Sequence, residues 1–492
     1  MFETAELGRT LSKEQFNERV PVLRDELLKA QRELLKADFP VFILLNGVDG
    51  AGKGETANLL NEWLDARLLE THAFEQPTEA DSQRPRFWRY WLRTPPRGKI
   101  GIYIGNWYTQ PIITQVLGHG SAKELARQLA EIRQFEQALV DDGALIVKFW
   151  FHLSKAQQKA RLSKLESDSK TSWRVTKEDW RRFKRYEEFR RVSELALRDT
   201  STGEAPWTVV EGADARSRSV TVGEELLSRL REHLTQRGAG KPPEPAPDAH
   251  SSDPLTILDR IDLSQSLEKR DYEPELERQQ ARLNKLSRKV RRQGKSVIVA
   301  FEGWDAAGKG GAIRRVIHAL DARQFRVIPI SAPSPEERAH HYLWRFWRDI
   351  PGPGRFTIYD RSWYGRVLVE RVEGFATRAE WRRAYGEINE FERQLTRDGR
   401  TALIKVWLHI SPEEQLRRFQ EREQTPYKAH KIGPEDYRNR EKWAAYEAAA
   451  DAMVSQTSTR AAPWTLVPAE CKYVARLRVL EAISAGIEGV LD

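Results

Sequence analysis

Along the second half of the chain, short apolar runs alternate with longer segments that mix apolar and polar residues. The apolar runs are dense in Val, Ile, Leu and Phe, and they lie at 296–301, 326–331, 355–360, 402–410 and 464–468. Segments long enough for helices, such as 335–349 and 379–397, separate them. Strands that are apolar on both faces and joined by helical crossovers predict a parallel sheet with helices on both sides. Ligands of such sheets bind beyond the carboxyl ends of the strands.

The chain carries this pattern twice. One match pairs NGVDGAGKGE at 46–55 with EGWDAAGKGG at 302–311, a shift of 256 residues. The shift is 257 residues where APWTVV at 205–210 pairs with APWTLV at 462–467. A shift that stays nearly constant over so long a stretch indicates a tandem duplication of one α/β domain.

A stretch rich in Pro, Gly, Ala and Ser separates the two copies, with the sequence RGAGKPPEPAPDAHSSDP at 237–254. This composition is typical of a flexible or extended linker. We therefore predict a first domain at 1–236, a linker at 237–255 and a second domain at 256–492. Each domain is expected to form a three-layer α/β/α unit around a parallel sheet.

Composition narrows the setting of the protein without identifying its chemistry. The 492 residues are 40% hydrophobic and 31% charged, which provides enough apolar material for large cores. The net charge of +9 suits an anionic partner, although over this length it also fits a role in solubility alone. Cys471 is the single cysteine, which excludes an internal disulfide framework and a thiolate metal cluster. The sequence shows no signal-peptide pattern and no apolar run of ~18 residues, so we expect a cytoplasmic protein without a membrane partner.

A phosphate-binding loop is predicted directly after the first strand of the second domain. Gly303, Gly308 and Lys309 fit the spacing G-x-x-x-x-G-K, in which backbone N–H groups cradle a phosphate. A glycine turn that only packs a helix on a strand is the alternative. The strand before the motif, the helix after it and its recurrence in the first domain favour the phosphate loop. The residue after the lysine is normally Ser or Thr, whose hydroxyl holds magnesium, but here it is Gly310.

Two acidic residues are candidates for the missing metal ligand. Asp305 lies inside the loop, and Asp360 closes the strand RFTIYD at the ligand edge of the sheet. Carboxylates at neighbouring strand ends can hold Mg²⁺ through oxygen, with water and phosphate completing the octahedron. Asp305 could instead stabilise a turn, and Asp360 could cap a helix. Their joint presence beside a phosphate loop favours the metal site.

Basic residues follow these acids. Arg361 and Arg366 come directly after the strand, with Glu370 further on, and guanidinium groups suit phosphate oxygens because they donate bidentate hydrogen bonds. The segment at 417–436, RRFQEREQTPYKAHKIGPED, is basic and partly helical. It is predicted to be a lid that closes over a polyanion. For most of its residues, a solvated charged helix is the alternative.

Together these motifs resemble the type 2 polyphosphate kinases, and the two-copy layout resembles their fused polyphosphate:AMP phosphotransferase subgroup. The matching pieces include GWDAAGKGG at 303–311, YDRSWYGR at 359–366 and EDYRNREKWAAYEAAADAM at 435–453. The resemblance implies a P-loop kinase-like fold with a helical lid at about 412–445. It also implies Mg²⁺-dependent transfer of phosphate between inorganic polyphosphate and AMP, with ADP as the product.

The resemblance further implies roles for individual residues. Asp305 and Asp360 would be the essential acids and metal ligands, and Lys309 would be the loop lysine. The phosphate clamps would be Arg361, Arg366 and Arg422. The substrate-binding residues would be Gly303, Gly308, Gly310, Glu370, Lys428 and Lys431, with the two lysines along the polyphosphate path. One departure from the family pattern is His430, where the family is expected to carry Trp.

The first domain keeps the loop but loses its partners. Asp49 and Lys53 remain, but the positions of the second carboxylate and the first two clamps hold Ile104, Gly105 and Gln110. Loss of these groups should severely impair phosphoryl transfer, so we predict that the first domain is inactive. The duplication would then make the chain a pseudo-dimer, which is compatible with further oligomerisation.

Two other functions fit parts of the sequence. An ATP-dependent nucleoside monophosphate kinase shares the loop and lid, but Gly310 counts against it. A nucleic-acid-binding protein would use the basic run at 288–295 and the Trp residues. We expect no nucleic-acid partner, because FWRYW at 87–91 and LWRFW at 343–347 have the spacing of a buried helix face. His409 lies in an apolar run and is expected to be a core residue and not a catalyst.

Overall fold

The computed structural model describes residues 1–238, 256–425 and 433–491. The chain divides into two compact units, each built mainly from one copy of the repeat. The first unit comprises Met1–Pro77, Arg89–Pro242 and Pro335–His341, and the second comprises Thr78–Trp88, Pro243–Ser334 and Tyr342–Asp492.

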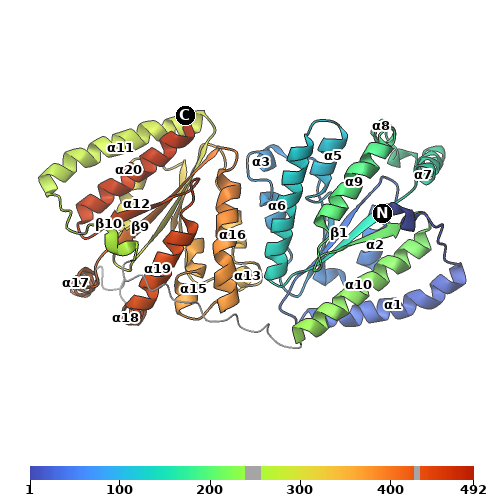
Figure 1. Cartoon of the computed structure of the whole chain (residues 1–492), viewed down its shortest axis with the longest axis horizontal. Coiled ribbons are helices and arrows are strands. Elements are labelled where there is room, and N and C mark those ends of the chain that lie inside the picture. The colour runs from blue at the N-terminus through green and yellow to red at the C-terminus, as the bar shows by residue number, and fades with distance from the viewer. Residues whose placement is uncertain (239–255, 426–432, 492) are drawn as a thin grey trace. The chain divides into compact units, whose positions relative to one another are not determined.

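Helices (α), short 3₁₀ helices (η) and strands (β) are labelled in Figure 1. The elements of the first copy are η1 (Phe2–Ala5), α1 (Lys13–Leu34), β1 (Val41–Gly47), α2 (Lys53–Trp63), η2 (Ala66–Leu68), β2 (Leu69–Ala73), α3 (Glu79–Ser82), α4 (Trp88–Trp91), β3 (Ile100–Ile104), α5 (Thr109–Val116), α6 (Ala122–Asp141), β4 (Leu145–His152), α7 (Lys155–Ser167), η3 (Ser172–Arg174), α8 (Lys177–Phe183), α9 (Tyr186–Thr200), β5 (Trp207–Glu211) and α10 (Ala215–Gly238).

The second copy repeats this order of elements with few changes. Its elements are η4 (Leu258–Arg260), α11 (Lys269–Arg292), β6 (Ser296–Gly303), α12 (Lys309–His318), β7 (Phe325–Pro329), α13 (Pro335–Arg338), α14 (Trp344–Arg348), β8 (Phe356–Asp360), η5 (Trp363–Arg366), α15 (Val369–Val372), α16 (Arg378–Thr396), β9 (Thr401–His409), α17 (Pro412–Glu423), α18 (Pro434–Glu441), α19 (Trp443–Thr457), β10 (Trp464–Pro468) and α20 (Lys472–Leu491).

Each unit contains a five-stranded parallel sheet, and the two sheets have the same strand order. The order is β2-β3-β1-β4-β5 in the first and β7-β8-β6-β9-β10 in the second. Figure 1 shows helices on both faces of each sheet, with α11 and α20 on one face of the second sheet and α16 and α19 on the other. The prediction of two three-layer α/β units with parallel sheets is confirmed. In the second sheet Phe301 pairs with Asp360, so the loop after β6 and the carboxyl end of β8 lie at the same end of the sheet.

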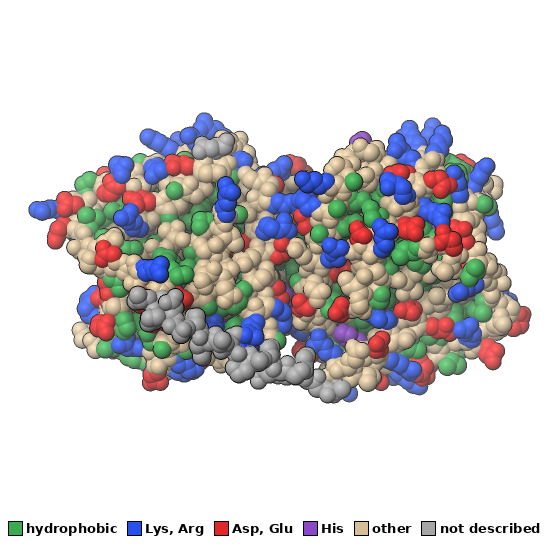
Figure 2. All heavy atoms as spheres, in the orientation of Figure 1, with side chains coloured by type: hydrophobic (Ala, Val, Ile, Leu, Met, Phe, Trp, Pro, Cys, Tyr) green, Lys and Arg blue, Asp and Glu red, His purple; other side chains and the backbone are tan. Residues whose placement is uncertain are grey.

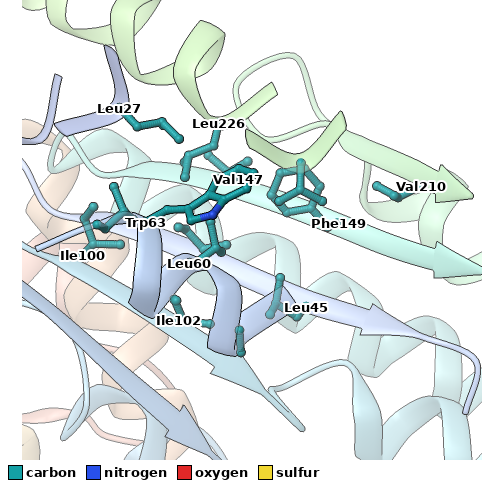
Figure 3. Packing of buried hydrophobic residues seen from close by; sticks show 14 of the residues in the cluster. Leu27, Leu45, Leu60, Trp63, Ile100, Ile102, Val147, Phe149, Val210 and Leu226 are labelled. Atoms are coloured by element: carbon teal, nitrogen blue, oxygen red, sulfur yellow. The ribbon is translucent and has the colours of Figure 1, made fainter. Parts of the chain in front are cut away.

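The core of the first unit lies between its sheet and the helices α1, α2 and α10. Figure 3 shows Trp63 from α2 beside Val147 of β4, with Leu27 of α1 and Leu226 of α10 above the sheet. Strand β1 is buried along nearly its whole length, as expected for a central parallel strand covered on both faces. Burial of these side chains stabilises the sheet and fixes the positions of the strand ends where ligands bind.

Helix starts in the second unit follow local capping chemistry. Thr377 and Glu380 form a capping box at the start of α16, and Ser411 caps α17, whose first residue is Pro412. The helix expected at 379–397 is thus confirmed within a residue at each end. The single helix expected at 335–349 was wrong: this segment forms α13 and α14, with a break between them.

The aromatic motifs lie in the short helices α4 and α14. Phe87 and Trp91 are buried, as are Trp344 and Trp347, so the prediction that they serve the core is confirmed. Figure 2 shows Lys and Arg side chains interspersed with Asp and Glu over the visible surface. Among the helices of the described ranges, none combines the length and the apolar character needed to cross a membrane.

Candidate phosphate- and metal-binding site

The loop between β6 and α12 has the geometry expected of a phosphate cradle. Gly303 has a φ of 139°, and a Cβ at this position would lie 2.4 Å from the carbonyl oxygen of Leu408, so only glycine fits. Gly308 has a φ of 106° and forms the N-cap of α12. A helix N-terminus after such a loop is an anion-binding site. A Cβ at Gly310 would meet no atom within 4 Å, so packing does not force the absence of Ser or Thr there.

Lys309 folds back over this loop. Its Nζ donates hydrogen bonds to the carbonyl oxygens of Gly303, at 2.7 Å, and Trp304, at 3.0 Å. Burial lowers the pKa of Lys309, and the charge of Asp305 opposes this effect. An ammonium group has three donors, so the two bonds to the loop leave one for an anion in the cradle.

Asp305 is fixed by contacts from three elements. Its carboxylate accepts hydrogen bonds from Arg361 at 2.9 Å and from Asn439 at 3.3 Å, and its carbonyl oxygen accepts one from Gln415 at 3.1 Å. Burial would raise the pKa of Asp305, but the charges of Lys309 and Arg361 outweigh burial and lower it. The carboxylate is therefore ionised at neutral pH. Because its partners come from other elements, these contacts do not support the alternative of a turn-stabilising Asp.

Asp360 is the last residue of β8, at the same edge of the sheet. Among the described residues, none donates a hydrogen bond to its carboxylate. The N-cap of the following helix η5 is Ser362, so Asp360 is not the helix cap that the sequence also allowed. Within the described ranges, no three His, Cys, Asp or Glu side chains form a cluster suited to a metal ion. A two-carboxylate site agrees with Mg²⁺, which proteins often hold through one or two carboxylates and substrate phosphates.

Arg361 has an unusual backbone conformation for a residue with a side chain. Its φ is 64°, in the left-handed region, and its N–H donates to the carbonyl oxygen of Phe301 at 3.0 Å. The next residue, Ser362, is held by the buried carboxylate of Glu302, which accepts bonds from its backbone N–H at 2.7 Å and its hydroxyl at 2.8 Å. These contacts impose the strained backbone and direct the chain just after Asp360. Strain of this kind concentrates at functional sites.

A cavity of about 90 Å³ lies among these residues. Asp305 and Arg361 line it, together with Asn439 from α18 and Trp443 and Tyr446 from α19. The cavity therefore joins the loop after β6, the residue after β8 and the helices α18 and α19 within the second unit.

Two indoles close one side of the cavity. The rings of Trp304 and Trp443 stack with centroids 3.6 Å apart and an angle of 11° between planes. The Nε1 of Trp304 donates to Nδ1 of His409 at 3.1 Å, and Trp407 donates to the same atom at 3.3 Å. Burial lowers the pKa of His409 to about 4, so it is a neutral acceptor at pH 7. His409 is thus a core residue, as expected, and it orients an indole of the loop.

The other residues predicted to bind phosphate or substrate come from η5, α15, α17 and the segment that follows α17. Arg366 pairs with Glu370 at 3.1 Å, and its guanidinium lies over the ring of Tyr342, 4.5 Å from the centroid. Arg422 lies in the last turn of α17. None of these three predicted residues lines the cavity, and neither do Lys309 and Asp360. The roles of all the site residues stay predictions. Lys428 and Lys431 lie outside the described residues.

Helix α17 contacts the loop directly through a residue that the sequence did not single out for this role. Arg418 of α17 donates to the carbonyl oxygen of Ala306 at 3.0 Å and to those of Ala469 and Glu470 at 2.7 and 2.8 Å. Because Arg418 joins α17, the loop and the segment after β10, it braces the cradle. While Arg418 makes these bonds its guanidinium is occupied, so we do not expect it to bind phosphate.

A buried ion pair supports η5, the helix that follows Arg361. Lys405 and Glu392 are almost fully buried and lie 2.7 Å apart, and the hydroxyl of Tyr364 in η5 donates to Glu392 at 2.6 Å. The first unit repeats the pair with Lys148 and Glu136 at 2.8 Å. Because both copies contain this ion pair, it supports the fold of each unit and is not specific to a reaction in the second copy.

The edge of the first sheet differs in shape as well as in charge. Gly105 has a φ of 67°, close to that of its counterpart Arg361, but a Cβ there would lie 2.1 Å from the carbonyl oxygen of Phe74. An arginine therefore does not fit unless the backbone moves. The buried carboxylate of the second unit is also lost: the amide oxygen of Asn46 takes the place of Glu302, and it accepts a hydrogen bond at 2.5 Å from Asn106, the counterpart of Ser362.

Three residues of the site were not among those predicted for it. Glu302 follows the strand expected at 296–301 and was not singled out, and the partners Asn439 and Trp443 lie far along the chain from the loop. A comparison of the copies contains the signal for Glu302, because an acid in one copy and Asn46 in the other marks a position where the charge was not retained. No local pattern indicates the stacking of Trp304 on Trp443.

The fold and the site define the class of P-loop phosphate-binding α/β proteins. The comparisons with known proteins identify the family. The family model Polyphosphate kinase 2 (PPK2) matches residues 10–238 and 266–490, and the chain belongs to this family. The chain is 51% identical over 490 residues to a protein from Pseudomonas aeruginosa named Polyphosphate:AMP phosphotransferase, covering 99% of each chain. It is 39% identical to a protein of the same name from Acinetobacter johnsonii, covering 90% of this chain and 89% of that one.

A solved structure supports the same placement. The chain matches a crystal structure from Pseudomonas aeruginosa PA01, described as polyphosphate kinase 2, with a TM-score of 0.89 and 48% sequence identity. The match covers 100% of this chain and 99% of the other. The resemblance inferred from the motifs is therefore confirmed, and both copies belong to one family.

Proposed function

We propose that the second copy transfers the terminal phosphoryl group of inorganic polyphosphate to AMP, forming ADP and a polyphosphate one phosphate shorter. The observation that carries this proposal is the placement of Asp305 and Asp360 at the ends of neighbouring parallel strands, beside Lys309 and Arg361. The relatives named Polyphosphate:AMP phosphotransferase, which match this chain over most of their length, support the choice of substrates.

The proposed metal is Mg²⁺, held by Asp305 and Asp360. The residues present fit this ion, because both ligands are carboxylates and the carboxylate of Asp360 accepts no hydrogen bond from a described residue. When bound, Mg²⁺ would neutralise phosphate charge. The hydroxyl ligand missing at Gly310 is then replaced by an acid within the loop itself.

The residues of the chain have the charges that this reaction requires. The second pKa of a phosphate monoester is near 6, so the AMP phosphate is largely dianionic at neutral pH and needs no strong base. Its oxygen forms a bond to the terminal phosphorus as the bond from that phosphorus to the bridging oxygen breaks. The bridging oxygen leaves with the shortened polyphosphate. Lys309 and Arg361 lower the cost of bringing these anions together and keep them aligned.

We further propose that the first copy does not catalyse this reaction. It has Ile104 where the second copy has Asp360, and the carbonyl oxygen of Phe74 occupies the space that a side chain at position 105 would need. A single restoring substitution would therefore not repair the site.

The test is an assay of the purified full chain with polyphosphate, Mg²⁺ and each nucleoside monophosphate in turn. We expect ADP from AMP, and no diphosphate when a chelator removes the metal. A parallel reaction with ATP in place of polyphosphate tests the alternative donor. Faster turnover with ATP, or the absence of any nucleoside diphosphate with polyphosphate, would show that the proposed donor is wrong.

A further inference from the structure

The first unit contains a larger cavity than the second at the equivalent place. The cavity has a volume of about 310 Å³, against about 90 Å³ in the second unit. Most residues that line the smaller cavity have counterparts, shifted by 256 or 257 residues, that line the larger one. Volumes near 300 Å³ are at the lower end of those found for small-molecule sites.

The extra space has a specific origin. In the second unit, Trp304 stacks on Trp443 and their rings fill the region next to the loop. The first unit has Val48 and Tyr186 at these positions, and Gly105 replaces the arginine beside them. The first unit has lost the groups proposed for catalysis, and the absence of the two stacked indoles leaves a larger cavity next to its loop.

The inner wall of the cavity is apolar and aromatic, with one unsatisfied polar group. Trp150 lines the cavity, stacks on Phe189 with centroids 5.8 Å apart, and is 2% exposed. Its Nε1–H has no hydrogen-bond partner among the described residues, whereas its counterpart Trp407 donates to His409. The Nδ1 of His152, the counterpart of the atom that accepts from Trp407, also has no partner among the described residues, so the two copies differ in this contact behind the wall.

The outer end of the cavity is polar and carries more positive than negative charge. Lys53, Arg182 and Arg185 line it, with Asp49 and Glu178 as the acids. Gly52 has a φ of 97° and forms the N-cap of α2, so the loop keeps the conformation of the second copy. Since a helix N-terminus and a surplus of cations meet here, this end favours an anion.

We infer that the cavity of the first unit binds a nucleoside monophosphate without transferring its phosphoryl group. The phosphate lies at the polar end, near the loop and Arg182. The base lies against the aromatic wall formed by Trp150 and Phe189. This inference concerns binding alone, and it does not depend on the reaction proposed for the second copy.

The test uses the full chain and photolabelling with 8-azido-AMP, followed by mass spectrometry of the labelled peptides. We expect label in the segments 104–117 and 178–189 of the first unit, reduced by an excess of AMP more than by adenosine or inorganic phosphate. The substitution Val48→Trp adds the indole that fills the corresponding space in the second copy. It should reduce labelling of these segments at least tenfold.

A matched variant controls for the added indole. Val22→Trp makes the same change on α1 at a side chain that is 65% exposed and does not line the cavity, so labelling should be unchanged. If Val48→Trp does not fold, equilibrium dialysis of the wild-type chain measures how many AMP molecules bind per chain. We expect two when both units bind. Absence of label from the first unit, or one bound AMP per chain with label confined to the second unit, would overturn the inference. Failure to form ADP, with the first unit still labelled, would count against the proposed function only.

Discussion

Replacement of Arg361 by glycine should leave the stability of the second copy nearly unchanged and remove most of its activity. The residue has a φ of 64°, a conformation that costs a non-glycine residue ~1–2 kcal/mol. Glycine removes this cost but gains ~0.4–1 kcal/mol of unfolded-state entropy. The lost ion pair with Asp305 is 2.9 Å long, but the Arg361 side chain is 54% exposed, so the pair contributes at most ~1 kcal/mol. These effects nearly cancel, and we expect the free energy of unfolding to change by less than ~1 kcal/mol.

The same substitution should abolish most of the activity. Arg361 is the guanidinium that contacts Asp305 beside the cradle, and an arginine that neutralises a transferring phosphoryl group contributes ~10³-fold or more to turnover. The variant Arg361→Ala provides the control. It also lacks the guanidinium but keeps a side chain in the left-handed conformation, so it should be ~1 kcal/mol less stable than Arg361→Gly and equally inactive.

A probe confined to the second copy is needed because two units rarely unfold as a single step. Cys471 is the one cysteine of the chain and lies just before α20, so the rate of its thiol labelling through a urea series reports on this copy. Turnover is measured as ADP formed from polyphosphate and AMP. The reasoning is refuted if Arg361→Gly loses several kcal/mol of stability, or if it keeps turnover within tenfold of the wild type.

Two further substitutions test the scaffold, with the same thiol probe. Lys405→Met leaves the buried carboxylate of Glu392 unpaired and should cost about 3–5 kcal/mol, while the double variant Lys405→Met, Glu392→Gln should recover most of it; additive losses would contradict the pairing. Burial lowers the pKa of His409 to about 4. Between pH 6.5 and 4 the unfolded state therefore binds more protons than the folded state, and the free energy of unfolding decreases as the pH is lowered. The wild type should lose up to about 3 kcal/mol more over this window than His409→Asn, which keeps an acceptor near the two indoles; equal losses would show that His409 does not titrate in this way.

The sequence was sufficient to predict the sheets and to bring two candidate site residues to the same end of the second sheet. Strands that are apolar on both faces, and a loop motif with fixed spacing, place Asp305 and Asp360 at one edge, because the carboxyl ends of parallel strands coincide there. The contacts of Asn439 and Trp443 depend on how distant helices pack, which local spacing does not encode. The break between α13 and α14 was missed because its apolar residues fit a continuous helix equally well.

The two copies also differ in structure by more than the substitutions in the sequence suggested. The sequence shows that Gly105 replaces an arginine, which predicts a lost clamp. The structure adds that the carbonyl oxygen of Phe74 lies where a side chain would begin, and that Val48 leaves a cavity beside the loop. The first copy is thus reshaped around its loop, while Lys53 still donates to the carbonyl oxygens of Gly47 and Val48 as Lys309 does to those of the second loop.

The measurement that tests the account most directly is the turnover of Asp360→Asn with polyphosphate and AMP, with folding monitored at Cys471. The substitution keeps the size of the side chain and removes the charge from a carboxylate that accepts no hydrogen bond from a described residue. The account predicts a loss of ~10³-fold or more in ADP formation with stability unchanged within ~1 kcal/mol. Turnover within tenfold of the wild type would contradict the claim that the two strand-end acids act together beside the cradle.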